Sequence, residues 1–314
     1  MKRTILSLLL AAVLCLPFSG CSAAPAASGN SSQLTIVATL FPQYDFARQL
    51  AGDKAEIKLL LPPGAESHSF EPKPSDIIAV SQADLFLYTG EYMEPWAQTI
   101  IDGVADDDVE VVDVSQGISL VREDDEHESH EGHEAAHQHE YDPHVWTSPV
   151  NAMQMVKTIA DALCRADPEN EAYYRQNESD YLAQLQALDS ELREITTNAK
   201  RHTVYFGSRF ALFYFMQEYG LDYKAAYDSC SEETEPSVRS ITEMVDEIRA
   251  EGIPVIYYEE LTDPKIARVI SEETGAKMLL FHSCHNVSRQ ELEDGVTYLD
   301  LMRQNAQNLK EGLN

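Results

Sequence analysis

The sequence has few basic residues for its length. Lysine and arginine together number 23, against 53 aspartates and glutamates in 314 residues, and the formal net charge is −30. Proteins that bind nucleic acid need a basic surface to neutralise the phosphates. The composition therefore excludes nucleic acid as an expected partner. The negative field of such a chain would instead concentrate cations around it.

Long apolar runs are also lacking, apart from one run near the N-terminus. Ile5 to Leu16 is apolar, follows two basic residues and is shorter than the ~20 residues that span a bilayer. The following Phe-Ser-Gly-Cys21 resembles a bacterial lipobox. We expect residues 1–20 to be a lipoprotein signal peptide, Cys21 to carry lipid, and residues 21–33 to be a flexible tether. Because Phe18 departs from the usual aliphatic residue, plain secretion is the alternative.

Cysteine is scarce. Of the five cysteines, one lies in the signal peptide and Cys21 is the lipidation candidate, which leaves Cys164, Cys230 and Cys284. An odd number allows at most one disulfide within a monomer. Cys230 and Cys284 lie in loop-like sequence and could pair in an exported protein, whereas Cys164 fits a helix core. Zinc coordination by either loop cysteine is the alternative.

The sequence motifs of secreted hydrolases do not support an enzyme. The Gly-x-Ser-x-Gly turn is absent, and the one His-Glu-x-x-His pattern, at residues 133–137, lies in the low-complexity stretch 123–140, where no helix is expected. A zinc hydrolase would also need an open coordination position beside a general base. We therefore expect a protein that is not an enzyme, and keep a secreted zinc hydrolase as the less favoured alternative.

Histidine, by contrast, is concentrated in one acidic segment. Six of the ten histidines lie between Glu123 and His144, namely His127, His130, His133, His137, His139 and His144. Imidazole and carboxylate together suit Zn²⁺ better than Mg²⁺ or Ca²⁺. The low complexity of residues 123–140 is equally typical of a solvated loop with incidental metal affinity. The end of the segment, Asp142-Pro143-His144, looks ordered.

Apolar runs of strand length alternate with helical patterns along the rest of the chain. This alternation predicts right-handed βαβ crossovers and parallel sheets. The expected strands are Leu34–Leu40, Ile57–Leu61, Asp84–Tyr88, Val109–Asp113, Thr203–Phe206, Tyr223–Tyr227, Pro254–Glu259 and Lys277–Phe281.

A long helical pattern divides the strands into two groups. From Pro168 to about Lys200 no glycine or further proline interrupts it, which predicts a rigid helix of roughly 45 Å. We therefore expect an α/β protein with two parallel-sheet lobes, residues 34–166 and 201–314, joined by a long linking helix at 167–200.

A second histidine has an ordered setting. His68 follows Leu61-Pro-Pro-Gly in a stretch to Pro74 that holds four prolines and a glycine, so its backbone is stiff. The loop follows an expected strand, and parallel sheets bind ligands beyond the carboxyl ends of their strands. A lone loop histidine is often only a surface residue, but the pair with His144 favours metal ligation.

Several separated motifs resemble the zinc- or manganese-binding lipoproteins of bacterial ABC importers, the cluster A-I solute-binding family. The resemblance covers about Leu34 to Leu313. Its motifs are the loop ending in His68 with Phe70-Glu71-Pro72, the Asp142–Trp146 stretch, Tyr214-Phe215 with Tyr219-Gly220-Leu221, Glu235-Pro236-Ser237, and Tyr298–Asn305. The family implies one divalent metal ion held in the cleft between two lobes, delivery of that ion to a membrane permease, and a monomer.

The resemblance also implies four ligand positions. His68 and His144 match the first two, and His282 stands where the family usually has a carboxylate. The third position aligns with Arg209, which is always protonated and cannot ligate. The resemblance therefore predicts His68, His144 and His282 as ligands, and the remaining position is filled by Glu260, Glu66, His285 or water.

Two of these residues have alternatives. Arg209 could pair with Glu232, Glu233 or a carboxylate in the cleft and so tune the charge of the site. His282 could instead be a helix-cap or surface histidine.

Three imidazoles favour Zn²⁺ as the transported ion, because manganese relatives usually carry two carboxylates. The histidines before His144 are then a low-affinity collector over the cleft. The expected location is the extracytoplasmic face of a bacterial membrane, with a secreted or periplasmic protein as the alternative. A manganese importer component and a surface metal buffer or adhesin are the other functions that fit this site.

Overall fold

Two parallel sheets of four strands each form the framework of the protein. The computed structural model describes residues 33–68, 70–122, 141–227 and 236–314. The sheet of the N-terminal lobe has the order β2-β1-β3-β4, and that of the C-terminal lobe β6-β5-β7-β8. The strands are β1 (Leu34–Ala38), β2 (Ala55–Leu59), β3 (Leu85–Tyr88), β4 (Glu110–Asp113), β5 (Thr203–Phe206), β6 (Asp222–Ala225), β7 (Val255–Tyr258) and β8 (Lys277–Leu280). The predicted fold class is confirmed.

Helices connect these strands as the alternating pattern predicted. They are α1 (Phe41–Ala51), α2 (Pro74–Ser81), α3 (Ala97–Gly103), α4 (Pro149–Ala166), α5 (Glu171–Thr197), α6 (Phe213–Tyr219), α7 (Val238–Glu251), α8 (Lys265–Thr274), α9 (Arg289–Glu293) and α10 (Tyr298–Leu313). Local sequence sets several boundaries. Ser148 caps α4 by accepting from the Asn151 amide, and the left-handed Gly252 ends α7.

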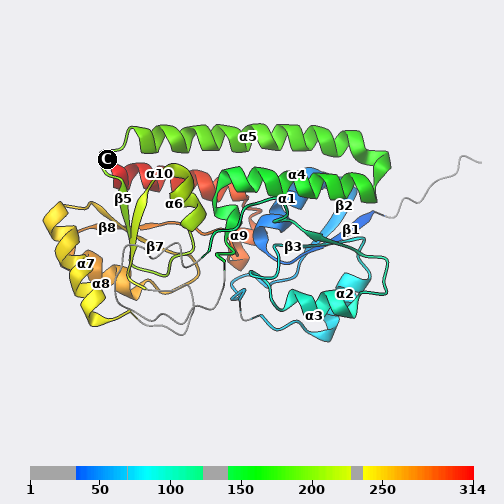
Figure 1. Cartoon of the computed structure of the whole chain (residues 1–314), viewed down its shortest axis with the longest axis horizontal. Helices are drawn as coiled ribbons and strands as arrows, with labels where there is room; N and C mark the ends of the chain where they lie inside the picture. The colour runs from blue at the N-terminus through cyan, green and yellow to red at the C-terminus, as the bar shows by residue number, and fades with distance from the viewer. Residues whose placement is uncertain (1–32, 69, 123–140, 228–235) are drawn as a thin grey trace, which may run out of the picture. The chain divides into compact units, whose positions relative to one another are not determined.

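The long helix α5 packs against α4 and α10 and so runs alongside elements of both lobes (Figure 1). Its buried face repeats at three- and four-residue steps and includes Tyr174, Tyr181, Leu185, Leu188 and Leu192. The predicted linking helix is confirmed. The α-helix itself begins at Glu171 because Pro168–Asn170 forms a preceding 3₁₀ turn.

The hydrophobic core divides according to the faces of the sheets. One continuous cluster joins one side of both sheets with α1, α4, α5 and α10. Separate clusters lie on the other side, under α2 and α3 in the N-terminal lobe and under α7 and α8 in the C-terminal lobe. Each sheet is therefore covered on both faces, as its apolar strands require.

Some details differ from the prediction. Helix α6 begins at Phe213, and Arg209 therefore lies in the loop before it. The short helix α9 was not predicted. In the described part of the chain, no helix combines the length and apolar character needed to cross a bilayer. The predicted signal peptide, the Cys21 lipidation site, nearly all of the tether and the five collector histidines lie outside the described residues.

A buried carboxyl group joins the ends of two strands in the N-terminal lobe. Glu94 is fully buried and accepts from the Thr39 hydroxyl after β1 and from the Thr89 amide, 2.9 Å away, after β3. Gln43 of α1 also donates to it at 3.3 Å. Burial raises the pKa of Glu94 from 4.5 to about 8, despite these hydrogen bonds. The group is therefore neutral in the folded protein at pH 7.

The raised pKa makes Glu94 a source of pH-dependent stability. Its contribution is complete below pH 4.5 and is lost as the pH rises through about 8, because only the unfolded chain ionises in that interval. The free energy of unfolding of the wild type, relative to Glu94→Gln, should fall by about 1.4 kcal/mol per pH unit between these values. Urea unfolding at several pH values measures this. The exposed Glu91→Gln is the control, and a constant difference between wild type and Glu94→Gln would contradict the prediction.

Candidate metal centre

The loop that carries His68 is held by main-chain and side-chain contacts at several points. Gly64 has φ = 77°, a left-handed conformation that favours glycine, and its amide donates to the Val287 carbonyl at 2.9 Å. The indole of Trp96 donates to the Ser67 carbonyl at 2.8 Å. The His68 amide donates to the Glu66 carboxylate at 3.0 Å. The stiff loop expected from its prolines is therefore reinforced by tertiary contacts.

His144 is oriented by the aspartate two residues before it. One oxygen of Asp142 accepts from the His144 amide at 2.7 Å and lies 3.0 Å from the ring nitrogen Nδ1. With Asp142 ionised, Nδ1 carries the proton and Nε2 is left with its lone pair. A carboxylate on the far nitrogen is the usual support of a histidine that ligates a metal.

His68 and His144 face each other in the structure. Their Nε2 atoms lie 3.3 Å apart, and the ring planes are inclined by 70°. Two imidazoles that bind one tetrahedral Zn²⁺ at about 2.0–2.1 Å have nitrogens about 3.3–3.4 Å apart. The observed spacing therefore fits a shared ion. Without metal, one ring donates its Nε2 proton to the other. For that ring to ligate an ion through Nε2 as a neutral imidazole, its proton must move to Nδ1.

A second group of polar side chains belongs to the C-terminal lobe. Nδ1 of His285 lies 2.7 Å from the Ser283 hydroxyl and 3.2 Å from Glu260 Oε1. Glu260 also accepts from the Ser283 amide at 2.8 Å. His285 thus has its Nδ1 engaged by a supported carboxylate, as His144 does, and Nε2 remains for a ligand.

The charges of Glu260 and His285 in this second group influence each other's pKa. Burial opposes the charge on Glu260, yet His282, His285 and Ser283 hold the pKa of this carboxyl well below its usual range. Burial likewise opposes protonation of His285, but its hydrogen bond to Glu260 and the nearby carboxylates raise its pKa. Binding of a cation by His285 must therefore displace a proton.

His282 has a different environment from His285. It is 1% exposed, and its Nδ1 accepts from the Cys284 amide at 2.9 Å. Burial lowers the pKa of His282, although Glu260 opposes the shift. Because Nδ1 accepts a hydrogen bond, the ring carries a proton on Nε2. That Nε2 has no hydrogen-bond partner among the described residues. The alternative of a surface histidine is therefore wrong.

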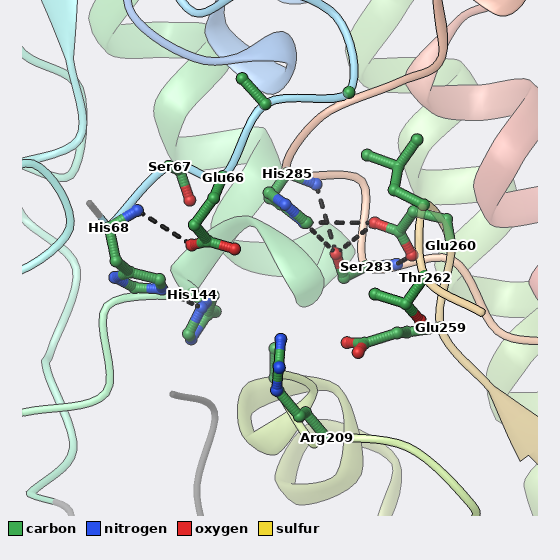
Figure 2. A pocket seen from close by; sticks show the side chains of 14 residues that line it. Glu66, Ser67, His68, His144, Arg209, Glu259, Glu260, Thr262, Ser283 and His285 are labelled. Carbon is green, nitrogen blue, oxygen red and sulfur yellow. Dashed lines mark hydrogen bonds and ion pairs between the residues drawn. The ribbon is translucent and has the colours of Figure 1, made fainter. Parts of the chain in front are cut away.

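One pocket contains most of the candidate residues. The cavity of about 80 Å³ is lined by Glu66, His68, His144, Arg209, Glu259, Glu260, Ser283 and His285, among others, but not by His282 (Figure 2). Burial raises the pKa of Glu259 to about 7, and the Glu260 charge adds to this effect while Arg209 opposes it. Arg209 thus acts electrostatically on a carboxylate of the pocket, and its role in tuning the charge of the site stays a prediction.

The backbone of the C-terminal lobe is strained beside the pocket. In the described part of the chain, the two non-glycine residues with positive φ are Leu261 (63°) and Cys284 (64°). They follow Glu260 and precede His285. Such conformations cost about 1–2 kcal/mol each and persist where the surrounding structure requires them. Both strained residues are next in sequence to side chains that line the pocket.

The structure brings together two of the predicted ligands. Among the described residues, no group of three or more histidine, cysteine, aspartate or glutamate side chains is close enough to hold an ion. Cys284 is a free and buried thiol. Its predicted disulfide partner Cys230 lies outside the described residues, as do Glu232 and Glu233, so the disulfide stays a prediction.

Sequence reasoning missed the residues that orient the histidines. Asp142 could have been found, because a carboxylate two residues before a histidine can reach its amide and ring. No comparable local sequence pattern indicates Ser283 or Glu259. Their role depends on how β7 and β8 end beside one another, since these strands are paired in parallel.

Comparison with known proteins links this arrangement to metal uptake. The model of the family "Zinc-uptake complex component A periplasmic" (ZnuA) matches residues 36–312. The high-affinity zinc uptake system protein ZnuA of Bacillus subtilis is 35% identical over 306 residues, covering 94% of this chain and 95% of that protein. The zinc-binding lipoprotein AdcA of Streptococcus pneumoniae is 32% identical over 308 residues. The chain is covered to 98% in that match but spans only 60% of AdcA.

Solved structures agree with this similarity. The metal-dependent lipoprotein YcdH from Bacillus subtilis superposes with a TM-score of 0.75 and 34% identity, over 89% of this chain and 99% of that one. The Zn(II)-bound ZnuA-like domain of Streptococcus pneumoniae AdcA also gives a TM-score of 0.75, with 29% identity over 90% of this chain and 99% of that domain.

Proposed function

Since the chain belongs to the family of the periplasmic component A of zinc-uptake complexes, we propose that it captures Zn²⁺ outside the cytoplasm and delivers it to an ABC-type membrane importer. The observation that carries this proposal is the pair of facing imidazoles, whose Nε2 atoms lie 3.3 Å apart. Capture and release require ligands and no bond-making step, so the protein acts as a carrier and not as an enzyme.

The ligands that we propose are His68, His144 and His285. His285 takes the position for which the sequence predicted His282, because it lines the pocket and has its Nδ1 supported by Glu260. Glu66, Glu260 or a water molecule completes the coordination. Among the described residues, no third ligand is within reach of the histidine pair, so binding through His285 requires its loop and the pair to approach each other.

Zinc fits this ligand set better than manganese. Three neutral imidazoles form a borderline-soft site, whereas Mn²⁺ prefers carboxylate and water oxygens. The related domain of AdcA was solved with Zn(II) bound.

The acidic, histidine-rich segment and the N-terminus complete the proposal. The net charge of −30 attracts cations, and the five histidines of residues 123–140 collect them at low affinity before His144 and His68 take them up. Lipidated Cys21 anchors the protein on the extracytoplasmic face of the membrane, next to the permease. We propose that it acts as a monomer.

An adhesin role is the second candidate. The laminin-binding protein Lmb of Streptococcus agalactiae, described as bifunctional with adhesin and metal transporting activity, is 27% identical with a TM-score of 0.75. Such a role would use the same metal site and differ only in its partner. Binding of the protein to immobilised laminin, with and without zinc, tests it.

Calorimetric titration of the mature protein tests the proposed function. We expect one tight Zn²⁺ site and an affinity for Mn²⁺ at least about 100-fold weaker, because imidazole ligands bind Mn²⁺ more weakly than Zn²⁺. Deletion of residues 123–140 should remove weak binding and leave the tight site intact. Equal affinity for both metals, or loss of the tight site in the deletion variant, would contradict the proposal.

A further inference from the structure

A tyrosine of the C-terminal lobe holds the loop of His144. The hydroxyl of Tyr214, in α6, donates to the Asp142 carbonyl at 2.8 Å and accepts from the Val121 amide at 3.1 Å. Asp142 and Val121 are themselves joined, since the Asp142 amide donates to the Val121 carbonyl at 2.9 Å. Tyr214 is 4% exposed. One buried hydroxyl therefore fixes the main chain of the residue whose carboxylate orients His144.

An asparagine of the C-terminal lobe holds the loop of His68 in a similar way. The side-chain amide of Asn286 donates to the carbonyls of Pro62 and Ala65, each at 2.9 Å. Its side-chain oxygen accepts from the Val287 amide at 2.8 Å, so the Asn286 side chain is fully used. Asn286 is 0% exposed and adjoins His285. The turn before His68 is thus tied to the chain segment that carries the third proposed ligand.

The two contacts act on both members of the histidine pair. His68 and His144 lie in loops of the N-terminal lobe, 76 residues apart in the sequence, and each loop is bonded to a buried side chain of the C-terminal lobe. We infer that Tyr214 and Asn286 are positioning residues that set the spacing of the two imidazoles and thereby the affinity for zinc. This inference rests on the proposed function.

The physical reason is the narrow geometry that zinc requires. Zn–N bonds lie within about 0.2 Å of their usual length, so a displacement of either loop by more than this stretches a bond or opens the angle. Mutation of a residue that positions a metal ligand, without touching the metal itself, commonly changes metal affinity 10- to 100-fold. Neither Tyr214 nor Asn286 needs to touch the ion to have such an effect.

The inference is tested with Tyr214→Phe and Asn286→Ala in the mature full-length protein. Tyr214→Phe keeps the ring and removes only the hydroxyl. The matched controls are Tyr219→Phe, which loses a 3.2 Å bond from the same helix to Asp189, and Asn308→Ala, which loses a 2.7 Å bond to the Leu280 carbonyl. Both controls remove a hydrogen bond of comparable kind away from the histidine loops.

The readouts are the Kd for Zn²⁺, obtained by competition with a chelator, the visible spectrum of the Co²⁺ form, and thermal unfolding without metal. We expect the Kd to rise about tenfold or more in Tyr214→Phe and Asn286→Ala, and to stay within about twofold in the controls. The Co²⁺ spectrum should lose the intensity of a tetrahedral site only in the first two. A purely structural role would lower unfolding temperatures and leave the Co²⁺ spectrum unchanged.

Three results would overturn the inference. The first is a Tyr214→Phe variant whose Kd for Zn²⁺ and Co²⁺ spectrum equal those of the wild type. The second is a loss of zinc affinity in the control variants as large as that in Tyr214→Phe and Asn286→Ala. The third is a wild-type protein without tight zinc binding, which alone would also reject the proposed function. If Asn286→Ala does not fold, Tyr214→Phe decides the outcome.

Discussion

Replacing His68 and His144 together by alanine is expected to abolish tight zinc binding. A site with four ligands binds Zn²⁺ with about 10–16 kcal/mol, or about 3 kcal/mol for each ligand. Loss of two ligands therefore weakens binding by roughly 10⁴-fold. The pair also supplies two nitrogens that are already spaced for one ion, 3.3 Å apart.

Chelator competition on the purified double variant measures this loss. His202→Ala is the control, since His202 is exposed and does not line the pocket. The weak binding that residues 123–140 contribute should remain, because it does not depend on the pocket. Tight binding by the double variant would show that the ion is held elsewhere and would reject the site.

The second large effect should distinguish His285 from His282. Asparagine reaches only as far as Nδ1 of histidine, so His285→Asn removes Nε2 and retains a donor toward Glu260. We expect this change to weaken zinc binding by about 100-fold or more, which corresponds to one ligand. His282→Asn keeps an acceptor for the Cys284 amide and should leave the Kd within about threefold.

Both variants are compared by the same zinc titration and by urea unfolding without metal. His282→Asn should affect stability more than affinity, because its ring is buried and contributes to the packing of the loop. The opposite ranking, with affinity lost only in His282→Asn, would restore the ligand set that the sequence predicted.

The sequence determined the fold well, because its signals are local. Each strand is a short apolar run, and a parallel sheet buried on both faces requires such runs. The buried face of α5 is visible as a repeat of Tyr174, Tyr181, Leu185 and Leu188 without glycine or proline. Boundaries were less certain, since the linking helix was expected from residue 167, whereas Pro168 opens a 3₁₀ turn and α5 begins at Glu171.

The part of the site in the N-terminal lobe, His68 and His144, was also predicted from the sequence. His68 stands in a proline-stiffened loop after a strand, and His144 ends the ordered-looking stretch Asp142-Pro143-His144. Both signals lie within a few residues of the histidine concerned. The structure indeed places these two rings against each other.

The part of the site in the C-terminal lobe could not be predicted from local sequence. Whether His282 or His285 faces the pocket depends on the left-handed conformation of Cys284, which a non-glycine sequence does not predict. It also depends on Glu260, which reaches Ser283 and His285 from a different strand end. Tertiary contacts, and not local pattern, decide which histidine lines the cavity.

The position of zinc in a crystal of the loaded protein tests the account most directly. Anomalous scattering at the zinc edge should give one strong peak about 2.0–2.1 Å from Nε2 of both His68 and His144, with His285 moved into the same coordination sphere. A principal peak away from the His68–His144 pair, or coordination by His282 in place of His285, would contradict it.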